Sequence, residues 1–389
     1  MLRKLTLVLC LGLLALGVPA FAQDATAEAT AEATAAKTTW VCPPEVVKAV
    51  QALPENDRVL NWYNWTTYEA DSTRPDFGAL CGVKVTEDNF GSNEELIAKL
   101  RQGNPGYDLV VPTGVNIPQM IREGLLEPID LTKIPNFANV TTALQNPAYD
   151  PGNKYTVPYQ WGTIAIGYNK EAVGKDVTSW DDLWNFKGNV AWIEDPRSMM
   201  GIALVLLGKD PNSTNADDIN AARDFLVDHG SNVKTIAQDD GQEKLVSGEA
   251  DMVVEYSGDI FQKMADCDAN ADLKCAGKYD FVIPKEGGIR WVDNLAIPKD
   301  APHKELAEAF IDYILDPQVG ADISNYTAYA TPNQKAIDDK LIDPTYLSST
   351  IIYPDEAASK TLFTVVDVGD DAARLYNDAW TELKTLLGQ

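Results

Sequence analysis

The stretch Pro284–Pro298, PKEGGIRWVDNLAIP, is the one around which the rest of the sequence can be interpreted. Gly287 and Gly288 relieve the steric limits on the backbone and allow a sharp turn or a close approach to a ligand. The apolar run that follows contains one carboxylate, Asp293, two residues after Trp291. Because strand side chains alternate between two faces, Trp291 and Asp293 are expected on the same face.

An aromatic face beside an anion is a pairing that binds a small organic cation, through a cation–π contact and a charge-assisted hydrogen bond. Taken alone, the segment is equally explained by a core tryptophan beside an exposed aspartate, and that explanation is the simpler one. The hypothesis of a cation site therefore depends on how many similar pairs the rest of the chain supplies.

Length and charge limit the possible classes of protein. A chain of 389 residues is longer than one hydrophobic core usually serves, so two lobes are expected. The net charge of −26 provides no basic surface for nucleic acid and disfavours binding to anionic membranes. Such a charge fits an exported protein or one that attracts cations.

The N-terminus has the features of a secretory signal peptide over residues 1–22. Arg3 and Lys4 precede an apolar run, and Ala20-Phe21-Ala22 is a small-x-small cleavage site. Cys10 lies inside the apolar run, so no lipid anchor is expected. Residues 23–41 are predicted to be a low-complexity Ala/Thr/Glu spacer, whose repetitive part, 24–39, lacks core-forming residues. The mature protein is expected to be secreted across the cytoplasmic membrane, to a periplasmic, cell-envelope or extracellular location.

Four cysteines remain after cleavage, and an oxidising compartment favours disulfides. Three connectivities are possible. We favour Cys267–Cys275, which closes a short polar loop, and Cys42–Cys81, which ties the N-terminal extension to the first lobe. A zinc site is not expected, because both histidines lie far in sequence from all four cysteines.

From Arg58 onward, apolar strand-like runs alternate with helical patterns. This βαβαβ order is typical of a parallel α/β sheet, whose ligands bind at the carboxyl ends of the strands. The polar segments 64–68 and 112–115 fall at such ends. The predicted elements are strands over 58–65, 82–90 and 107–114 and helices over 92–103 and 117–123.

The second half of the chain extends this pattern into another lobe. The β-rich stretch 155–169 is suited to carry the chain across, and 278–298 to bring it back. Amphipathic helices are predicted over 303–315 and 371–387. The expected fold is an α/β clamshell, with the ligand gripped between two lobes. Its lobes are predicted as 42–160 plus 291–336 for lobe I and 161–290 plus 337–389 for lobe II.

Several segments resemble, in order and with similar spacing, those of the spermidine/putrescine-binding proteins, which are extracytoplasmic receptors of polyamine ABC importers. The resemblance covers nearly everything from Arg58 to the C-terminus. The segments are NWTTY (64–68), GSNEELIAKL (91–100), YDLVVPTG (107–114), VPYQWGTIAIGYN (157–169), TSWDDLW (178–184), YSGD (256–259), PKEGGIRWVDNLAIP (284–298) and YATPN (329–333).

The resemblance implies a periplasmic-binding-protein-like fold with a hinge and a cleft between the lobes. It implies that aromatic rings hold the methylene chain of a polyamine while carboxylates hold its ammonium groups. The expected partners are this small cationic ligand and the membrane subunits of an ABC permease, and the protein is expected to be a monomer. No cofactor, metal, nucleic acid or catalytic residue is expected.

Carried over position by position, the resemblance also assigns the ligand-binding residues. Thr67 stands where the family usually has an acid, and Ser198 stands where spermidine binders have a glutamate. Val115 and Val365 replace polar residues. The acids Asp195, Asp259 and Asp293 therefore remain as anchors. The full set is Trp65, Thr67, Tyr68, Thr113, Asp195, Ser198, Tyr256, Asp259, Trp291, Asp293 and Tyr329.

Other aromatic and acidic residues are better explained by structure. Trp161 and Trp192 are predicted to pack in the core at the junction of the lobes. Glu69 and Glu255 are predicted to be solvated or structural, although either one would be placed to compensate for the acid that is missing at Thr67.

Three alternatives remain open at this point. The receptor role could serve a less charged, amino acid-like or otherwise polar solute, because two acids are missing. A secreted hydrolase could use paired carboxylates, but the sequence contains no Gly-x-Ser-x-Gly elbow, histidine cluster or Gly-x-Gly-x-x-Gly loop. A sensor or adhesion protein could use the same clamshell without transport.

Overall fold

The computed structural model describes residues 38–238 and 240–389. The predicted signal peptide and nearly all of the predicted spacer lie outside the described residues. The strands are β1 (Val59–Asn64), β2 (Lys84–Asn89), β3 (Leu109–Val110), β4 (Leu126–Glu127), β5 (Thr156–Asn169), β6 (Val190–Ile193), β7 (Val233–Ala237), β8 (Met252–Tyr256), β9 (Tyr279–Val282) and β10 (Ile289–Pro298).

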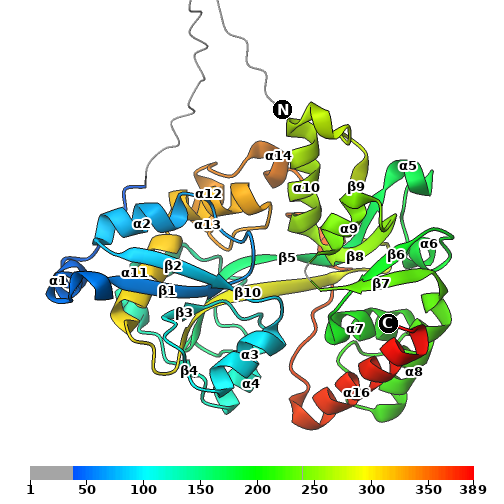
Figure 1. Ribbon diagram of the computed structural model, residues 1–389, viewed down its shortest axis with the longest axis horizontal. Helices are drawn as coiled ribbons and strands as arrows, with labels where there is room; N and C mark the ends of the chain where they lie inside the picture. Colours follow the sequence, from blue (N-terminus) through cyan, green and yellow to red (C-terminus); the bar gives the residue numbers. More distant parts are fainter. Residues whose placement is uncertain (1–37, 239) are drawn as a thin grey trace, which may run out of the picture. The chain divides into compact units, whose positions relative to one another are not determined.

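The α-helices lie on both sides of this sheet (Figure 1). They are α1 (Pro44–Ala52), α2 (Thr73–Cys81), α3 (Asn93–Arg101), α4 (Ile117–Arg122), α5 (Lys170–Val173), α6 (Trp180–Trp184), α7 (Pro196–Leu206), α8 (Ala216–His229), α9 (Gly241–Ser247), α10 (Ser257–Ala269), α11 (Lys304–Ile314), α12 (Pro317–Thr327), α13 (Gln334–Asp338), α14 (Pro344–Leu347), α15 (Glu356–Ser359) and α16 (Gly369–Leu387).

The sheet is parallel at its two ends and antiparallel in its middle. Its strand order is β2-β1-β3-β10-β5-β8-β6-β7, with β4 beside β10 and β9 beside β5. Strand β1 runs parallel to β2 and β3, and β6 runs parallel to β7 and β8. The predicted parallel α/β arrangement is therefore confirmed within each end. The antiparallel centre arises because β10 brings the chain back beside β5.

The β5–β10 ladder joins the two ends of the sheet, and Figure 1 shows the two strands side by side through its middle. The pairing runs from Ile289 opposite Ile164 to Ala296 opposite Thr156. Its register shifts between Asp293 and Asn294, which marks a local irregularity of the bulge type. Of the two stretches that were predicted to carry the chain between lobes, 155–169 forms the long strand β5, and 278–298 forms the short strand β9 followed by the long strand β10.

The predicted helix boundaries are reproduced closely because local capping signals define them. The Ser92 side chain accepts a hydrogen bond from the Glu95 amide at the start of α3. Ser179 and Asp182 form a capping box at α6. Helix α11 spans Lys304–Ile314, one residue inside the predicted range at each end, and α16 begins two residues before its predicted start.

Two disulfides are present, and both favoured pairings are confirmed. Cys42 is joined to Cys81 and Cys267 to Cys275. The first disulfide fixes the segment before α1 to the end of α2, where Trp40 packs against the rings of Phe77 and Tyr313. The N-terminal extension is therefore part of the folded core from Trp40 onward.

Gly287 is required by a close approach to the backbone rather than to a ligand. Its φ angle is +107°, and a Cβ atom there would lie 1.9 Å from the carbonyl oxygen of Thr361. The turn brings the C-terminal segment beside β10, where the Phe363 amide donates to the Gly288 carbonyl at 3.0 Å. The predicted steric role of this glycine is confirmed, and its partner is the backbone near residue 361.

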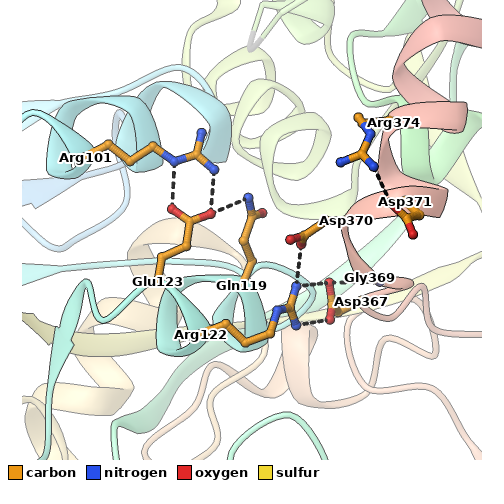
Figure 2. A network of polar contacts seen from close by, with 9 residues as sticks. All are labelled: Arg101, Gln119, Arg122, Glu123, Asp367, Gly369, Asp370, Asp371 and Arg374. Carbon is orange, nitrogen blue, oxygen red and sulfur yellow. Dashed lines mark hydrogen bonds and ion pairs between the residues drawn. The ribbon is translucent and has the colours of Figure 1, made fainter.

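The same C-terminal segment is anchored to α4 by an ion-pair network (Figure 2). Arg122 donates to both carboxylate oxygens of Asp367, at 2.5 and 3.2 Å, and to Asp370 at 3.0 Å. A second bidentate pair, Arg101 with Glu123 at 2.7 and 2.6 Å, joins α3 to the end of α4. Only the Arg122 pair links α4 to a segment almost 250 residues away in sequence.

Replacing Gly287 by alanine is expected to lower the free energy of unfolding by at least about 3 kcal/mol, because a backbone clash adds to the unfavourable positive φ. Gly174 is the matched control, because its φ is +70° and a Cβ there meets no atom within 4 Å. Gly174→Ala should cost about 1 kcal/mol. Chemical denaturation measures both values, and equal losses would contradict the proposed clash.

Replacing Arg122 by alanine is expected to accelerate amide hydrogen exchange across residues 364–370 several-fold, because the segment loses its anchor on α4. Arg101→Ala is the control, because its side chain is 49% exposed, against 43% for Arg122, and makes a similar bidentate pair. Both variants should change the free energy of unfolding by less than about 1 kcal/mol. Equal exchange rates in the two variants would refute the anchoring role.

Candidate ligand-binding cleft

A cleft opens at the carboxyl ends of the strands, where the topology predicted it. Loops that follow β1, β3, β6 and β8 supply its walls, together with residues of β5 and β10. It encloses about 1010 Å³ that is not filled by protein atoms, including the part that opens to solvent.

Ten of the eleven predicted ligand residues line this cleft. Thr67 is the exception: its side chain is exposed, and its neighbour Thr66 lines the cleft instead. Thr67 has a φ angle of +50°, which is unusual for a β-branched residue and turns the loop at this point. The ten residues are Trp65, Tyr68, Thr113, Asp195, Ser198, Tyr256, Asp259, Trp291, Asp293 and Tyr329.

Asp293 is a buried carboxylate that forms no ion pair with any residue that the structure describes. Its residue is 5% exposed, and Oδ2 accepts a hydrogen bond from the Tyr68 hydroxyl at 3.0 Å. Oδ1 has no hydrogen-bond partner among the described residues. Burial raises the pKa of Asp293 to about 7, although the neighbouring Thr113 and Tyr68 act in the opposite direction. An unpartnered carboxylate oxygen that faces a cleft is a site for a cation.

Asp259 supplies a second acid of the cleft. It lies in the first turn of α10 and is half-buried, because it faces the open space. Burial raises the pKa of Asp259 to about 6, whereas a hydrogen bond from Tyr329 and the charge of Lys263 lower it. The charges of Asp293 and Asp259 both contribute to the raised pKa of Tyr68, after burial, which is the largest cause.

Four aromatic rings form a connected wall beside these acids. Trp291 packs edge-on against Tyr256, with ring centroids 5.8 Å apart, and against Tyr329 at 5.1 Å. Tyr329 in turn contacts Tyr68 at 5.5 Å. Gly258 makes room for this wall, because a Cβ there would lie 2.5 Å from the Tyr329 ring. The geometry offers ring faces and edges to the carbon chain of a ligand.

Asp195 and Ser198 are coupled at the start of α7. Asp195 caps the helix by accepting from the Ser198 amide at 3.0 Å and from its hydroxyl at 2.5 Å. Ser198 is 1% exposed and therefore serves mainly to orient Asp195. Asp195 thus enters the cleft from the wall opposite to the loops of β1 and β3.

The residues that were predicted to be structural lie outside the cleft lining. Trp192 is fully buried and packs against Trp184, while Trp161 donates to the Thr331 carbonyl at 3.3 Å. Glu69 is buried and ion-paired with Arg74. Glu255 is fully buried. The prediction of core packing is confirmed for Trp192, and that of a structural role is confirmed for both glutamates. Trp161 is half-buried and contacts the Tyr353 ring outside the core.

Sequence reasoning missed three charged residues of the cleft, Glu94, Glu194 and Arg197. Glu194 is ion-paired with Lys384. Glu94 lies in the first turn of α3, and its position in a capping motif gave no sign of a ligand. Arg197 also lines the cleft, but the Tyr376 ring, 4.0 Å away, and the Asn212 side-chain oxygen, at 2.9 Å, hold its guanidinium.

Neither a metal centre nor a membrane span is found in the described part of the chain. No cluster of three or more His, Cys, Asp or Glu side chains there could hold a metal ion. No helix among residues 38–389 is long and apolar enough to cross a membrane. The chemistry that the cleft offers is recognition by rings and carboxylates.

Comparison with known proteins places this geometry in a family. A model described as "Bacterial extracellular solute-binding protein" matches residues 74–346. The spermidine/putrescine-binding periplasmic protein of Escherichia coli K12 is 35% identical over 334 residues, which cover 85% of this chain and 92% of that protein. The putrescine-binding periplasmic protein PotF of the same strain is 33% identical over 353 residues, with 87% and 94% covered.

A solved structure agrees with these sequence relatives. The spermidine/putrescine ABC transporter substrate-binding protein PotD from Streptococcus pneumoniae has a TM-score of 0.71 at 30% identity. The match covers 85% of this chain and all of that one. The predicted resemblance and fold class are therefore confirmed. The chain belongs to the bacterial extracellular solute-binding proteins, in the branch that contains the spermidine/putrescine-binding periplasmic proteins.

Proposed function

We propose that this protein is the extracytoplasmic receptor of an ABC importer and that it binds a polyamine, such as putrescine or spermidine, in the cleft. The observation that carries the proposal is the unpartnered, buried Oδ1 atom of Asp293 beside the ring of Trp291. Burying a carboxylate without a counter-charge is costly, so a bound ammonium group would offset that cost. The names of the relatives support a polyamine as the source of the ammonium group.

In the bound state, Asp293 and Asp259 hold one ammonium group and Asp195 holds another. The rings of Trp291, Tyr256 and Tyr329 line the methylene chain through cation–π and dispersion contacts. This assignment is supported by the position of all six residues on one cleft. None of these roles requires a bond to be made or broken, which supports a receptor rather than an enzyme.

Recognition is coupled to closure of two lobes, with boundaries at 42–160 plus 291–336 and at 161–290 plus 337–389. The β5–β10 ladder, which joins the parallel ends of the sheet, supports this division. Closure would present one combined surface to the membrane subunits of a permease. The periplasmic location of the relatives and the two disulfides support a site of action outside the cytoplasm.

Titration calorimetry on the mature protein should show saturable binding of putrescine or spermidine. Asp293→Asn should weaken that binding at least about tenfold, because a charged hydrogen bond is lost. Asp217→Asn, an exposed change of the same kind in the first turn of α8, should leave affinity unchanged. If no polyamine gives a binding signal but an amino acid-like solute does, the receptor role is retained and the polyamine is rejected as the ligand.

Affinity should rise by up to about tenfold per pH unit between pH 5.5 and 7 and then level off, because the cation requires ionised Asp293. The pKa of Asp293, about 7 in the fold, exceeds its unfolded value. The contribution of Asp293 to the stability of the ligand-free protein is therefore fully present below the unfolded pKa and lost as pH rises through 7. Calorimetry and denaturation across this range test both trends, and a flat affinity profile would count against Asp293 as the anchor.

A further inference from the structure

Glu94 is a carboxylate of the cleft whose local hydrogen bonds, to the Ser92 side chain and to its own backbone, are not ion pairs. It lies in the first turn of α3, and its side chain is exposed to the cleft. The adjacent Glu95 is occupied structurally, because it accepts from the Gly91 amide at 3.0 Å and from the Tyr63 hydroxyl at 3.3 Å. Within the part of the chain that the structure describes, Glu94 forms no ion pair with lysine or arginine.

A second carboxylate faces Glu94 from the other wall. Asp195 and Glu194 follow β6, and their charges add to burial, the larger cause, in raising the pKa of Glu94. Glu194 already has a cation, because its Oε1 lies 2.6 Å from Lys384 Nζ and also accepts from Trp380 at 2.8 Å. Among the described residues, the Asp195 side chain accepts only from Ser198. Glu94 and Asp195 are therefore two carboxylates of the cleft with no lysine or arginine between them in residues 38–238 and 240–389.

The acids of the cleft fall into two groups. The charges of Asp293 and Asp259 both raise the pKa of Tyr68, whereas the charges of Asp195 and Glu194 raise the pKa of Glu94. Apolar side chains line the same cleft, among them Ile193, Ile289 and Val365. Two anionic groups and an apolar lining match a ligand that carries ammonium groups on a hydrocarbon chain.

We infer that Glu94, beside Asp195, binds the third ammonium group of a triamine and therefore favours triamines over diamines. This inference rests on the proposed polyamine-binding function. Glu94 supplies an acid that is otherwise missing at Thr67, whose side chain is turned out of the cleft, and at Ser198, whose hydroxyl is donated to Asp195. A diamine uses the two anchors at Asp293 and Asp195, whereas a triamine carries one more ammonium group, which the further carboxylate of Glu94 would hold.

The test is calorimetry with spermidine and putrescine on the mature protein and its Glu94→Gln variant. Spermidine affinity should fall at least about tenfold and putrescine affinity by a smaller factor, so that their ratio changes. Glu94→Asp should restore part of the loss, because it keeps the charge. Glu171→Gln, an exposed change in the first turn of α5, is the matched control and should change neither affinity.

The outcomes separate this inference from the function on which it rests. An unchanged spermidine-to-putrescine ratio in Glu94→Gln, with binding still weakened by Asp293→Asn, would overturn the role of Glu94 and leave the receptor function standing. An equal loss for both ligands would indicate a structural effect and also overturn the selective role. No amine binding by the unsubstituted protein would overturn the proposed function and the inference together.

Discussion

The constraint on which this structure depends is the burial of a carboxylate in the middle of its sheet. Asp293 is 5% exposed on β10, and one of its oxygens has no partner among the described residues. Placing a charge there costs stability, because a buried carboxylate loses its hydration. The fold tolerates this cost through hydrogen bonds from Tyr68 and Thr113 and through partial protonation at neutral pH. The charge of Asp293 is compensated only when a cation binds in the cleft. The cleft therefore favours ligand binding at the expense of the stability of the ligand-free protein.

Much of the fold and of the site follows from short-range patterns in the sequence. Strand runs that end in polar loops placed Trp65, Tyr68 and Thr113 at carboxyl ends, and parallel pairing brings such ends together. The alternation rule placed Trp291 and Asp293 on the same face, and both reach the cleft. The resemblance to a family added the acids of the opposite wall, which no local pattern connects to Asp293.

The sequence could not give the features that depend on loop conformation and on distant partners. Thr66 and Thr67 are chemically alike, and only the positive φ of Thr67 decides which one faces the cleft. Glu94 and Glu95 are likewise equivalent in sequence, but Tyr63 and Gly91 engage one and leave the other to the cleft. The antiparallel centre of the sheet depends on the pairing of β10 with β3 and β5. The periodicity of side chains within one strand does not show which strand lies beside it.

The register shift in β10 has a mechanical consequence. A strand with a bulge bends and twists more readily there than a regular strand does, and this shift lies directly after Asp293. A cation held by Asp293 would add contacts at that point, beside the loops that carry Tyr68 and Thr113. Ligand binding would therefore make the β5–β10 ladder, which joins the two ends of the sheet, more resistant to twisting. A partner protein whose surface fits only one angle between the two ends of the sheet would then distinguish the ligand-bound protein from the ligand-free protein without contacting the ligand.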